Sequence, residues 1–227
     1  TIPTGWSKRL RSFEGEDVPF EVVYRYRPRE YGDQLVRMYI LTNDEKSELG
    51  TTPLPDGIVR VFRKHGKDGL SYLAAQSIQY IPIGDKIELN LGVDKEVVFE
   101  LVKVRTWRDE IWLRLQNINV LRKVEGGMQL EDNSPVVGWD EHTLYNQRVR
   151  NYTSKAIKVE VRRAWPGDIT FRSGLNPKLI DYQTVELASS VKPGEKQDLL
   201  FEIVQKQGTN AKQSRVVLED AKLTLER

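Results

Sequence analysis

Hydrophobic and polar residues alternate along most of this chain, which is the pattern of strands that bury one face. The clearest alternation near the N-terminus places apolar side chains at Phe20, Val22, Tyr24 and Tyr26, with charged residues among the positions between them. Similar runs predict further strands at 35–42, 58–63, 70–80, 86–91, 96–107, 111–124, 142–152, 157–163, 169–172, 184–187, 198–205 and 215–219. Beyond residue 219 a short terminal helix competes with a strand. No long segment with a helical period of about 3.6 residues separates these runs, so we predict an all-β fold, a largely antiparallel β-sandwich-like architecture.

Turn signals separate the predicted strands and indicate where the chain divides. Clusters of proline, glycine and aspartate at 53–57 and 82–85 favour reversals of the chain. The polar, glycine-containing stretch 125–135 is the strongest candidate for a boundary. We therefore predict two packed lobes, an N-terminal β-rich lobe at 1–130 and a C-terminal β-sandwich-like lobe at 131–227.

The composition is that of a water-soluble globular protein, with 39% hydrophobic and 30% charged residues. Thirty-five basic and 33 acidic side chains give a net charge of +2, too balanced for the molecule as a whole to bind nucleic acid. No apolar run approaches the roughly 20 residues that a membrane-spanning helix needs. Cysteine is absent, which excludes disulfides, thiolate nucleophiles and cysteine metal sites. The chain starts without Met or a basic-then-apolar leader, so we expect a processed product or a piece of a longer protein.

Few residues are available for catalysis or metal binding. The two histidines, His65 and His142, lie far apart in the sequence, and no Gly-x-Ser-x-Gly elbow accompanies them. The glycine-containing loop 64–69 fits neither the Walker nor the dinucleotide pattern. Acidic loops at 44–48 and 131–133 could offer oxygen ligands to calcium but do not fit the EF-hand pattern, and solvated loops are the simpler interpretation. We therefore predict no enzyme, with no catalytic, cofactor-binding or metal-binding residue and no cofactor.

An aromatic and basic cluster near the N-terminus is the first candidate contact surface. In a strand, Tyr24 and Tyr26 share one face while Arg25 and Arg27 share the other. This segregation favours a core face and a solvated face, and a nucleic-acid or glycan surface is the alternative. Arg25 and Arg27 are therefore candidate contact residues on the solvated face.

Two tryptophans form the second candidate contact surface. Trp107 and Trp112 become cross-strand partners on one face if a loop of even length joins their strands. If the rings are exposed, they would stack on a sugar or on a partner's apolar side chain. If they are buried, they would pack between the lobes, which is the commoner use of tryptophan.

Several turn and strand motifs together resemble one bacterial protein family. The motifs are LGTTPLPDGIVRVF at 49–62, IELNLG at 87–92, RVRNY at 148–152 and AWPG at 164–167. They are similar to the C-terminal β domain of the mucoidy-inhibitor-A-like family, itself a domain of unknown function, over roughly 34–205. The resemblance implies a β-rich fold and an association with the cell envelope or secretion, and it supplies no catalytic residue. The family's N-terminal coiled-coil-containing region is absent here, so no activity that needs it is implied.

These observations together predict a non-enzymatic β-sandwich module of a larger bacterial protein, which mediates protein–protein interaction or positions other domains. The expected partner is a protein or another domain of the parent chain, with no nucleic acid, no membrane-spanning segment and a glycan as the alternative. A carbohydrate-binding module is the first alternative function, and coplanar exposed rings at Trp107 and Trp112 would favour it. A hydrolase with a carboxylate pair in a cleft between the lobes is the second.

Overall fold

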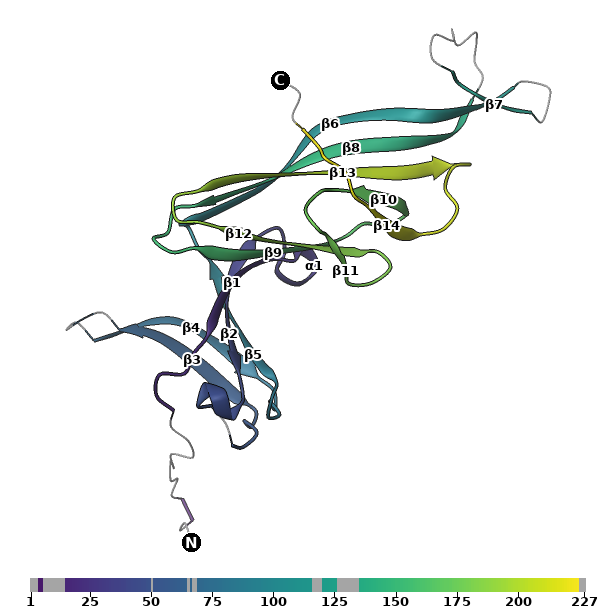
Figure 1. Cartoon of the computed structure of the whole chain (residues 1–227). Helices are drawn as coiled ribbons and strands as arrows, with labels where there is room; N and C mark the ends of the chain where they lie inside the picture. The colour runs from purple at the N-terminus through teal and green to yellow at the C-terminus, as the bar shows by residue number, and fades with distance from the viewer. Residues whose placement is uncertain are drawn as a thin grey trace. The chain divides into compact units, whose positions relative to one another are not determined.

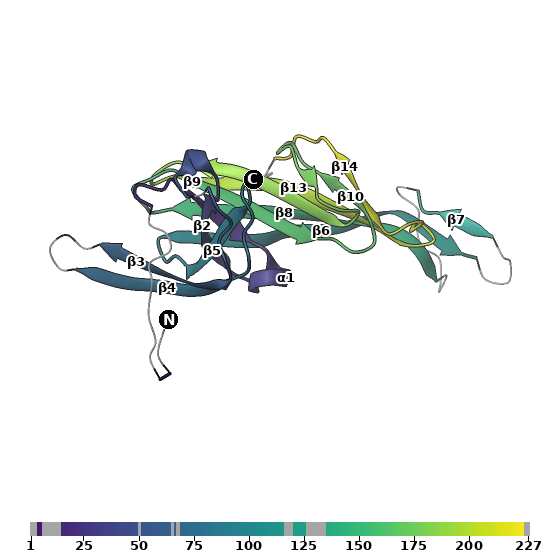
Figure 2. The ribbon, with the colours of Figure 1, turned by 90° about the horizontal axis from the view of Figure 1, so that it is seen from below.

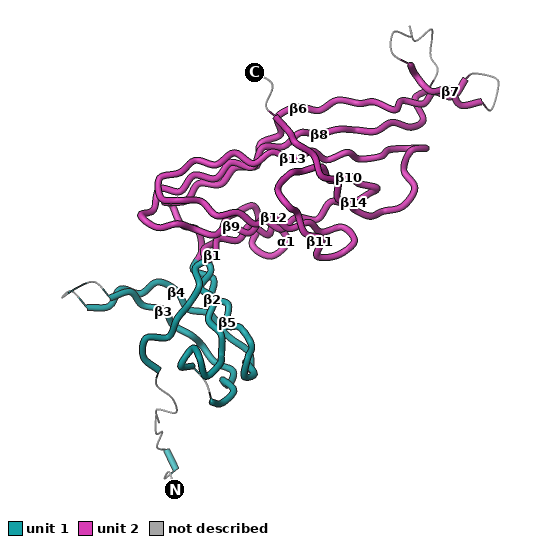
Figure 3. Tube along the Cα trace, in the orientation of Figure 1, with its two compact units in different colours: residues 1–22, 38–91 teal, residues 23–37, 92–227 magenta. Residues whose placement is uncertain are grey.

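A computed structural model describes residues 4–5, 15–49, 51–64, 66, 69–115, 120–125 and 135–224. The chain forms two compact units, coloured separately in Figure 3: unit 1 holds residues 1–22 and 38–91, and unit 2 holds residues 23–37 and 92–227. The expected lobe boundary after residue 130 falls inside unit 2. The reason is that the strands on either side of it, Val97–Arg114 (β6) and Val136–Asn151 (β8), pair with each other.

Strands dominate the described chain, which confirms the all-β prediction. The other elements in Figure 1 are β1 (Glu21–Tyr26), α1 (Pro28–Tyr31), β2 (Leu35–Thr42), the 3-10 helix η1 (Glu45–Ser47), β3 (Gly57–Lys64), β4 (Leu70–Ile78), β5 (Lys86–Val93), β7 (Leu121–Lys123), β9 (Ile157–Ala164), β10 (Asp168–Arg172), β11 (Lys178–Leu179), β12 (Thr184–Val191), β13 (Lys196–Gly208) and β14 (Arg215–Glu219). Each predicted strand overlaps an observed one, and residues 220–224 form neither helix nor strand. Within the described ranges no helix is long and apolar enough to cross a membrane.

The described strands are hydrogen-bonded into three sheets. The first has the order β11-β12-β9-β1-β2-β5, the second has the order β14-β10-β13-β8-β6-β7, and β3 and β4 form a two-stranded ribbon. The antiparallel pairs include β12 with β9 and β8 with both β13 and β6, whereas β1–β9 and β10–β14 are parallel. The borders between the two units fall within β1, β2 and β5.

The core of unit 2 lies between the strands of the first sheet and those of the second (Figures 1 and 2). Strand β9 shows how the sequence produces it, because Ile157, Val159 and Val161 are buried while the residues between them are half-buried or exposed. Two clusters of buried side chains fill the core: Tyr24, Tyr26, Leu35, Val97, Val149, Ile157, Val159, Val161 and Val191 form one, and Trp165, Ile169, Phe171, Val185, Leu187, Phe201, Ile203 and Val216 form the other.

Strand β6 is longer than the sequence predicted. The two runs 96–107 and 111–124 were expected to be separate strands, but β6 continues from Val97 to Arg114. Glu110 adopts a positive φ of 46°, and the register with β8 shifts between Asp109 and Trp112. The polar residues at this point therefore form an irregularity within one strand instead of a turn between two.

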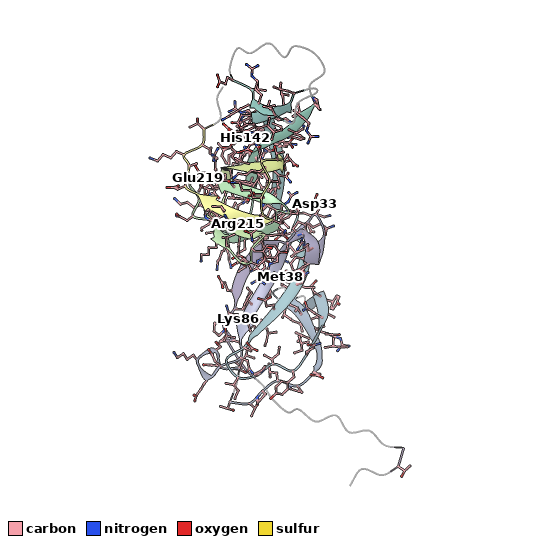
Figure 4. The ribbon with its side chains drawn as sticks, turned by 90° about the vertical axis from the view of Figure 1, so that its right-hand side faces the viewer. Asp33, Met38, Lys86, His142, Arg215 and Glu219 are labelled. Atoms are coloured by element: carbon pink, nitrogen blue, oxygen red, sulfur yellow. The ribbon has the colours of Figure 1, made fainter. Side chains whose placement is uncertain are left out.

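Unit 1 is built on the buried side chains of β2 and β5, which are Met38, Ile40, Ile87 and Leu89. Figure 4 labels Met38 on β2 and Lys86 at the start of β5. The fully buried Asn43 follows β2, and its amide donates to the carbonyls of Thr52, Ile81 and Pro82 at 3.4, 3.2 and 3.1 Å. This single side chain thereby links the two proline-containing segments that the sequence marked as turns.

Candidate functional site

A pocket of about 1090 Å³ opens in unit 2 where several chain segments meet: the end of β1 with α1, the turn into β6, the end of β9 and the loop before β12. Small-molecule sites usually measure roughly 300–1,000 Å³, so this pocket has room for a ligand of several residues. Apolar and aromatic walls come from Tyr26, Leu35, Val97, Phe99, Leu101, Tyr145, Ala164 and Ile180, cations from Arg27, Arg29, Lys95, Arg162 and Arg163, and carboxylates from Glu30, Asp33, Asp94, Glu100 and Asp181.

Two of these carboxylates interact with residues a few positions earlier in the chain. Asp33, labelled in Figure 4, accepts a hydrogen bond from the Tyr26 hydroxyl at 2.5 Å. Glu30, on the single-turn helix α1, forms an ion pair with Arg27 at 3.2 Å. Both acids are therefore neutralised or hydrogen-bonded by the protein itself.

Asp94 is the most heavily engaged carboxylate of the pocket. It accepts from the Tyr24 hydroxyl at 2.8 Å and from Arg37 at 2.9 Å. Burial raises the pKa of Asp94, but the backbone N–H of Glu96, the Tyr24 hydroxyl and the Arg37 charge together outweigh burial and hold this pKa below its usual range. Asp94 is therefore an ionised acceptor at neutral pH.

The last two carboxylates of the pocket, Asp181 and Glu100, belong to exposed residues. Asp181 accepts the backbone N–H groups of Gln183 and Thr184, each at 2.8 Å, and these bonds lower its pKa. Glu100 lies opposite Arg148 in the pairing of β6 with β8. Four of the five pocket carboxylates thus already accept hydrogen bonds from the protein.

Some cations of the pocket have no carboxylate partner among the described residues. Arg162 pairs with Glu186 at 2.7 Å, whereas neither Arg163 nor Lys95 forms an ion pair with a carboxylate in the ranges that the structure describes. The Arg163 guanidinium lies 4.6 Å from the centre of the Trp165 ring, a cation–π contact that leaves its N–H donors available. The Nε atom of Arg27 is buried without a hydrogen-bond partner. The pocket, as far as the structure describes it, therefore contains cations without a carboxylate partner, whereas four of its five carboxylates accept at least one hydrogen bond from the protein.

Two buried tyrosines of the pocket region have raised pKa values. Burial raises the pKa of Tyr26 to about 12, with further contributions from the hydrogen bond to Asp33 and its charge, and the Arg163 charge opposes them. Burial and Asp94 raise the pKa of Tyr24 in the same way. Both hydroxyls are therefore hydrogen-bond donors across the physiological pH range.

Raising the pH above 10 is expected to destabilise unit 2. A tyrosine whose pKa is raised by folding stabilises the protein fully below its unfolded value of 10 and loses this contribution as the pH rises through about 12 for Tyr26. The Tyr26→Phe variant lacks this group, so its free energy of unfolding should fall less steeply with pH, by up to about 1.4 kcal/mol per pH unit. Urea unfolding at a series of alkaline pH values measures the slopes, and equal slopes for the two proteins would contradict the assignment.

A second cluster of polar side chains surrounds His142 on β8, in the other sheet of unit 2. Its Nδ1 lies 2.5 Å from Oε1 of Glu202, and its Nε2 lies 2.8 Å from Oδ1 of Asp109. Arg172 approaches Glu202 at 3.7 Å and pairs with Glu219 at 3.0 Å; Figure 4 labels His142 and Glu219. Because both ring nitrogens already face carboxylates, neither is left to activate a nucleophile or to bind a metal.

The two candidate tryptophans do not form a pair. Both lie on the single strand β6, so the loop that would have made them cross-strand partners does not exist. Trp107 stacks on His142 with 4.9 Å between ring centroids and 15° between ring planes, and Arg105 lies 4.5 Å from the same tryptophan ring. Trp112 lies opposite Gly138, four positions along β8 from His142. Both tryptophans are half-buried, so they are neither the exposed pair that would have favoured a carbohydrate-binding module nor a fully buried pair.

The two candidate arginines have different surroundings. Tyr24 and Tyr26 are buried as expected, but Arg25 is buried as well and pairs with Glu160 on the neighbouring parallel strand β9 at 3.0 Å. The expectation of a solvated face is therefore wrong for Arg25, because its charged group is paired with Glu160 on this face and is hardly exposed to water. Arg27, which follows β1, is half-buried and lines the pocket.

The acidic loop 44–48 belongs to no metal site among the described residues. Among the described residues no group of three or more histidines, aspartates or glutamates has the geometry to hold a metal ion. Asp44 instead caps η1 by accepting the Ser47 N–H at 2.8 Å. His65 and the loop 131–133 lie outside the described residues.

Sequence reasoning missed the pocket and the cation Arg163 that lines it. Arg163 was recognised only as the last residue of a predicted strand. Alternation places Arg163 and Trp165 on the same side of the chain, and this cation–aromatic spacing is the one local signal that could have singled out Arg163. Phe99 and Tyr145 come from two other strands, so no local pattern connects them to it.

Comparison with known proteins adds no relative, since no protein-family model, curated protein or solved structure matches the chain. The resemblance to the mucoidy-inhibitor-A-like family stays a prediction, as does the envelope or secreted location that it implies. The function of the chain is therefore inferred from its own side chains.

Proposed function

We propose that this chain is a non-enzymatic binding module whose pocket in unit 2 holds an acidic segment of a partner protein or of its parent chain. The supporting observation is that most pocket carboxylates accept hydrogen bonds within the protein, whereas Arg163 and Lys95 have no carboxylate partner among the described residues. Carboxylates of a ligand would accept charge-assisted hydrogen bonds from these cations.

The apolar walls favour a peptide over a small anion. Phe99, Leu101 and Tyr145 line the pocket beside the cations. Successive side chains of an extended segment point in opposite directions, so alternating acidic and apolar residues would reach the two kinds of wall at once. We therefore assign the ligand class as an extended segment with alternating acidic and apolar side chains.

The chemistry of the site favours binding over catalysis. A general acid at neutral pH needs a raised carboxyl pKa, but the pKa values of Asp94 and Asp181 are lowered. His142, the histidine within the described ranges, has both ring nitrogens engaged. These groups are suited to fixed hydrogen-bond networks and not to proton transfer.

Reversal of the Arg163 charge is expected to weaken binding of an acidic peptide at least about tenfold. The probe is a fluorescein-labelled eight-residue peptide of alternating aspartate and leucine, titrated with the whole chain and followed by fluorescence anisotropy. The wild-type chain should give saturable binding, and Arg163→Glu should bind more weakly because its new carboxylate repels the ligand. A peptide of alternating lysine and leucine should not bind.

Arg108→Glu is the matched control, because Arg108 is an exposed arginine of the other sheet that pairs with Glu141 and does not line the pocket. It should bind the acidic peptide like the wild type, and circular dichroism should show both variants folded. The proposal fails if the acidic peptide does not bind, or if the Arg163 and Arg108 variants weaken binding equally.

A further inference from the structure

The β3–β4 ribbon of unit 1 has one face made only of exposed residues, which we call the ribbon face. The pairing register places Ile58 opposite Ser77, Arg60 opposite Ala75, Phe62 opposite Tyr72 and Lys64 opposite Leu70, and all eight residues are exposed. Between Val61 and Phe62 the register shifts, because β4 contains one extra residue there. This extra residue reverses the alternation along β4, so the eight side chains lie on the same side of the ribbon. Figures 1 and 3 show the ribbon extending beyond β2 and β5 within unit 1.

The ribbon face combines large apolar side chains with positive charge. Ile58, Phe62, Leu70 and Tyr72 are 58, 47, 70 and 57% exposed. Arg60 and Lys64 lie between them on β3, and the described residues of the ribbon, 57–64, 66 and 69–78, contain no aspartate or glutamate. Clustered apolar exposure on this scale is unusual on a free surface and indicates contact with a partner.

The opposite face of the ribbon already has a structural role. Val59 and Val61 are half-buried on that side. The Gln76 side chain donates to the Glu88 carbonyl at 2.9 Å and accepts from the Asn90 N–H at 2.8 Å, so one amide joins the ribbon to the backbone of β5. The ribbon is therefore held by its inner face, and its outer face is available for binding.

We infer that the ribbon face docks on a lipid surface that carries anionic headgroups. Such a surface offers phosphate acceptors above apolar chains, which matches cations whose long stems reach outward from an apolar patch. A stable protein interface needs roughly 20–30 residues on each side, several times the size of this face, whereas binding to a lipid surface has no such minimum and grows with each apolar side chain and cation. The Phe62 and Tyr72 rings meet edge to face at 68°, so they offer no parallel stacking platform for nucleic-acid bases.

Co-sedimentation of the whole chain with lipid vesicles tests the inference. Vesicles of phosphatidylcholine with about 30% phosphatidylglycerol should bind the wild type, vesicles of phosphatidylcholine alone should bind it at least about tenfold more weakly, and about 0.5 M salt should reduce the binding to anionic vesicles. The double variant Phe62→Ser/Tyr72→Ser and the double variant Arg60→Glu/Lys64→Glu should each lose at least about tenfold in partitioning to the anionic vesicles.

The matched control replaces two exposed apolar residues of unit 2, Leu179→Ser/Tyr182→Ser, and should bind like the wild type. Sedimentation velocity of the wild type and the Phe62/Tyr72 variant shows whether the face instead joins two copies of the chain. The inference is overturned by equal binding to neutral and anionic vesicles, by ribbon variants that bind like the control, or by a wild-type dimer that the variant dissociates. The ribbon face shares no residue with the pocket of unit 2, so either proposal can fail without the other.

Discussion

Replacing Glu160 by glutamine is expected to lower the free energy of unfolding by about 3 kcal/mol. Glu160 accepts from Nε of Arg25 at 3.0 Å, and the two side chains are only 15% and 8% exposed. The guanidinium keeps its charge at every accessible pH, so removing the carboxylate leaves this charge in a region that water reaches poorly. Urea unfolding followed by tryptophan fluorescence measures the change, because four of the five tryptophans belong to unit 2.

The matched control is Glu219→Gln, because Glu219 also pairs with an arginine, Arg172, at 3.0 Å but is 50% exposed. Its expected cost is less than about 1 kcal/mol. The double variant Arg25→Met/Glu160→Leu removes both buried charges and should recover most of the lost stability, since apolar replacements of buried ion pairs are often close to neutral. The ion pair does not hold β1 against β9 if the two glutamine variants lose equal stability. The same conclusion follows if the double variant is less stable than Glu160→Gln.

The same ion pair sets the direction of the response to acid. Burial raises the pKa of Glu160, but the hydrogen bond and charge of Arg25, together with Lys158, outweigh burial and hold this pKa below its usual 4.5. A carboxyl group whose pKa is lowered by folding stabilises the protein above its unfolded value and loses this contribution as the pH falls through the folded value. The stability difference between the wild type and Glu160→Gln should therefore shrink as the pH falls below 4.5.

Arg25 shows how far alternation predicts this fold. The period-two pattern correctly placed Tyr24 and Tyr26 in the core, because that assignment depends only on which side of β1 is apolar. The opposite side was assigned to solvent, but the parallel pairing of β1 with β9 brings Glu160 directly opposite Arg25. Partners that are more than a hundred residues apart in the chain leave no local trace in the sequence.

The wrong turn within β6 and the helix α1, for which no element was predicted, have local causes. Polar residues between Trp107 and Trp112 resemble a turn, and nothing in the sequence shows that the non-glycine residue Glu110 adopts a left-handed conformation inside a strand. The helix Pro28–Tyr31 has four residues, too few to display a helical period. Strand positions were thus predictable from the sequence, whereas strand ends and irregularities were not.

The pocket was beyond sequence reasoning for a different reason. It collects side chains from the end of β1, the start of β6, β8 and the end of β9, which meet only after two sheets have stacked. Arg162 and Arg163 are adjacent in the sequence, yet one pairs with Glu186 and the other lies on Trp165. The alternation of side chains along a strand explains why the two arginines lie on opposite sides of β9. Only the assembled sheets show that Arg162 has a carboxylate partner and that Arg163 has none among the described residues.

Replacing Phe201 by alanine is expected to cost about 3–5 kcal/mol of stability in unit 2. The Phe201 ring is buried among three others, with centroid distances of 5.3 Å to Tyr145, 6.0 Å to Trp165 and 5.0 Å to Phe171. These neighbours lie on or next to three other strands that hydrogen bonds hold in place, so they cannot collapse into the vacated volume. Urea unfolding monitored by tryptophan fluorescence reports the loss directly, because Trp165 is part of the cluster.

Phe201 also connects the core to the pocket, because its neighbour Tyr145 lines both. Phe201→Ala should therefore lower the affinity for the acidic peptide as well as the stability of unit 2. Phe201→Leu should lower the stability by about 1–1.5 kcal/mol and retain peptide binding. Tyr182→Ala, at a residue that is 65% exposed, is the control and should stay within about 0.5 kcal/mol of the wild type. A Phe201→Ala variant as stable as this control would contradict the packing of the four rings, and a destabilised variant that still binds the peptide normally would show that the pocket does not depend on Phe201 to position Tyr145.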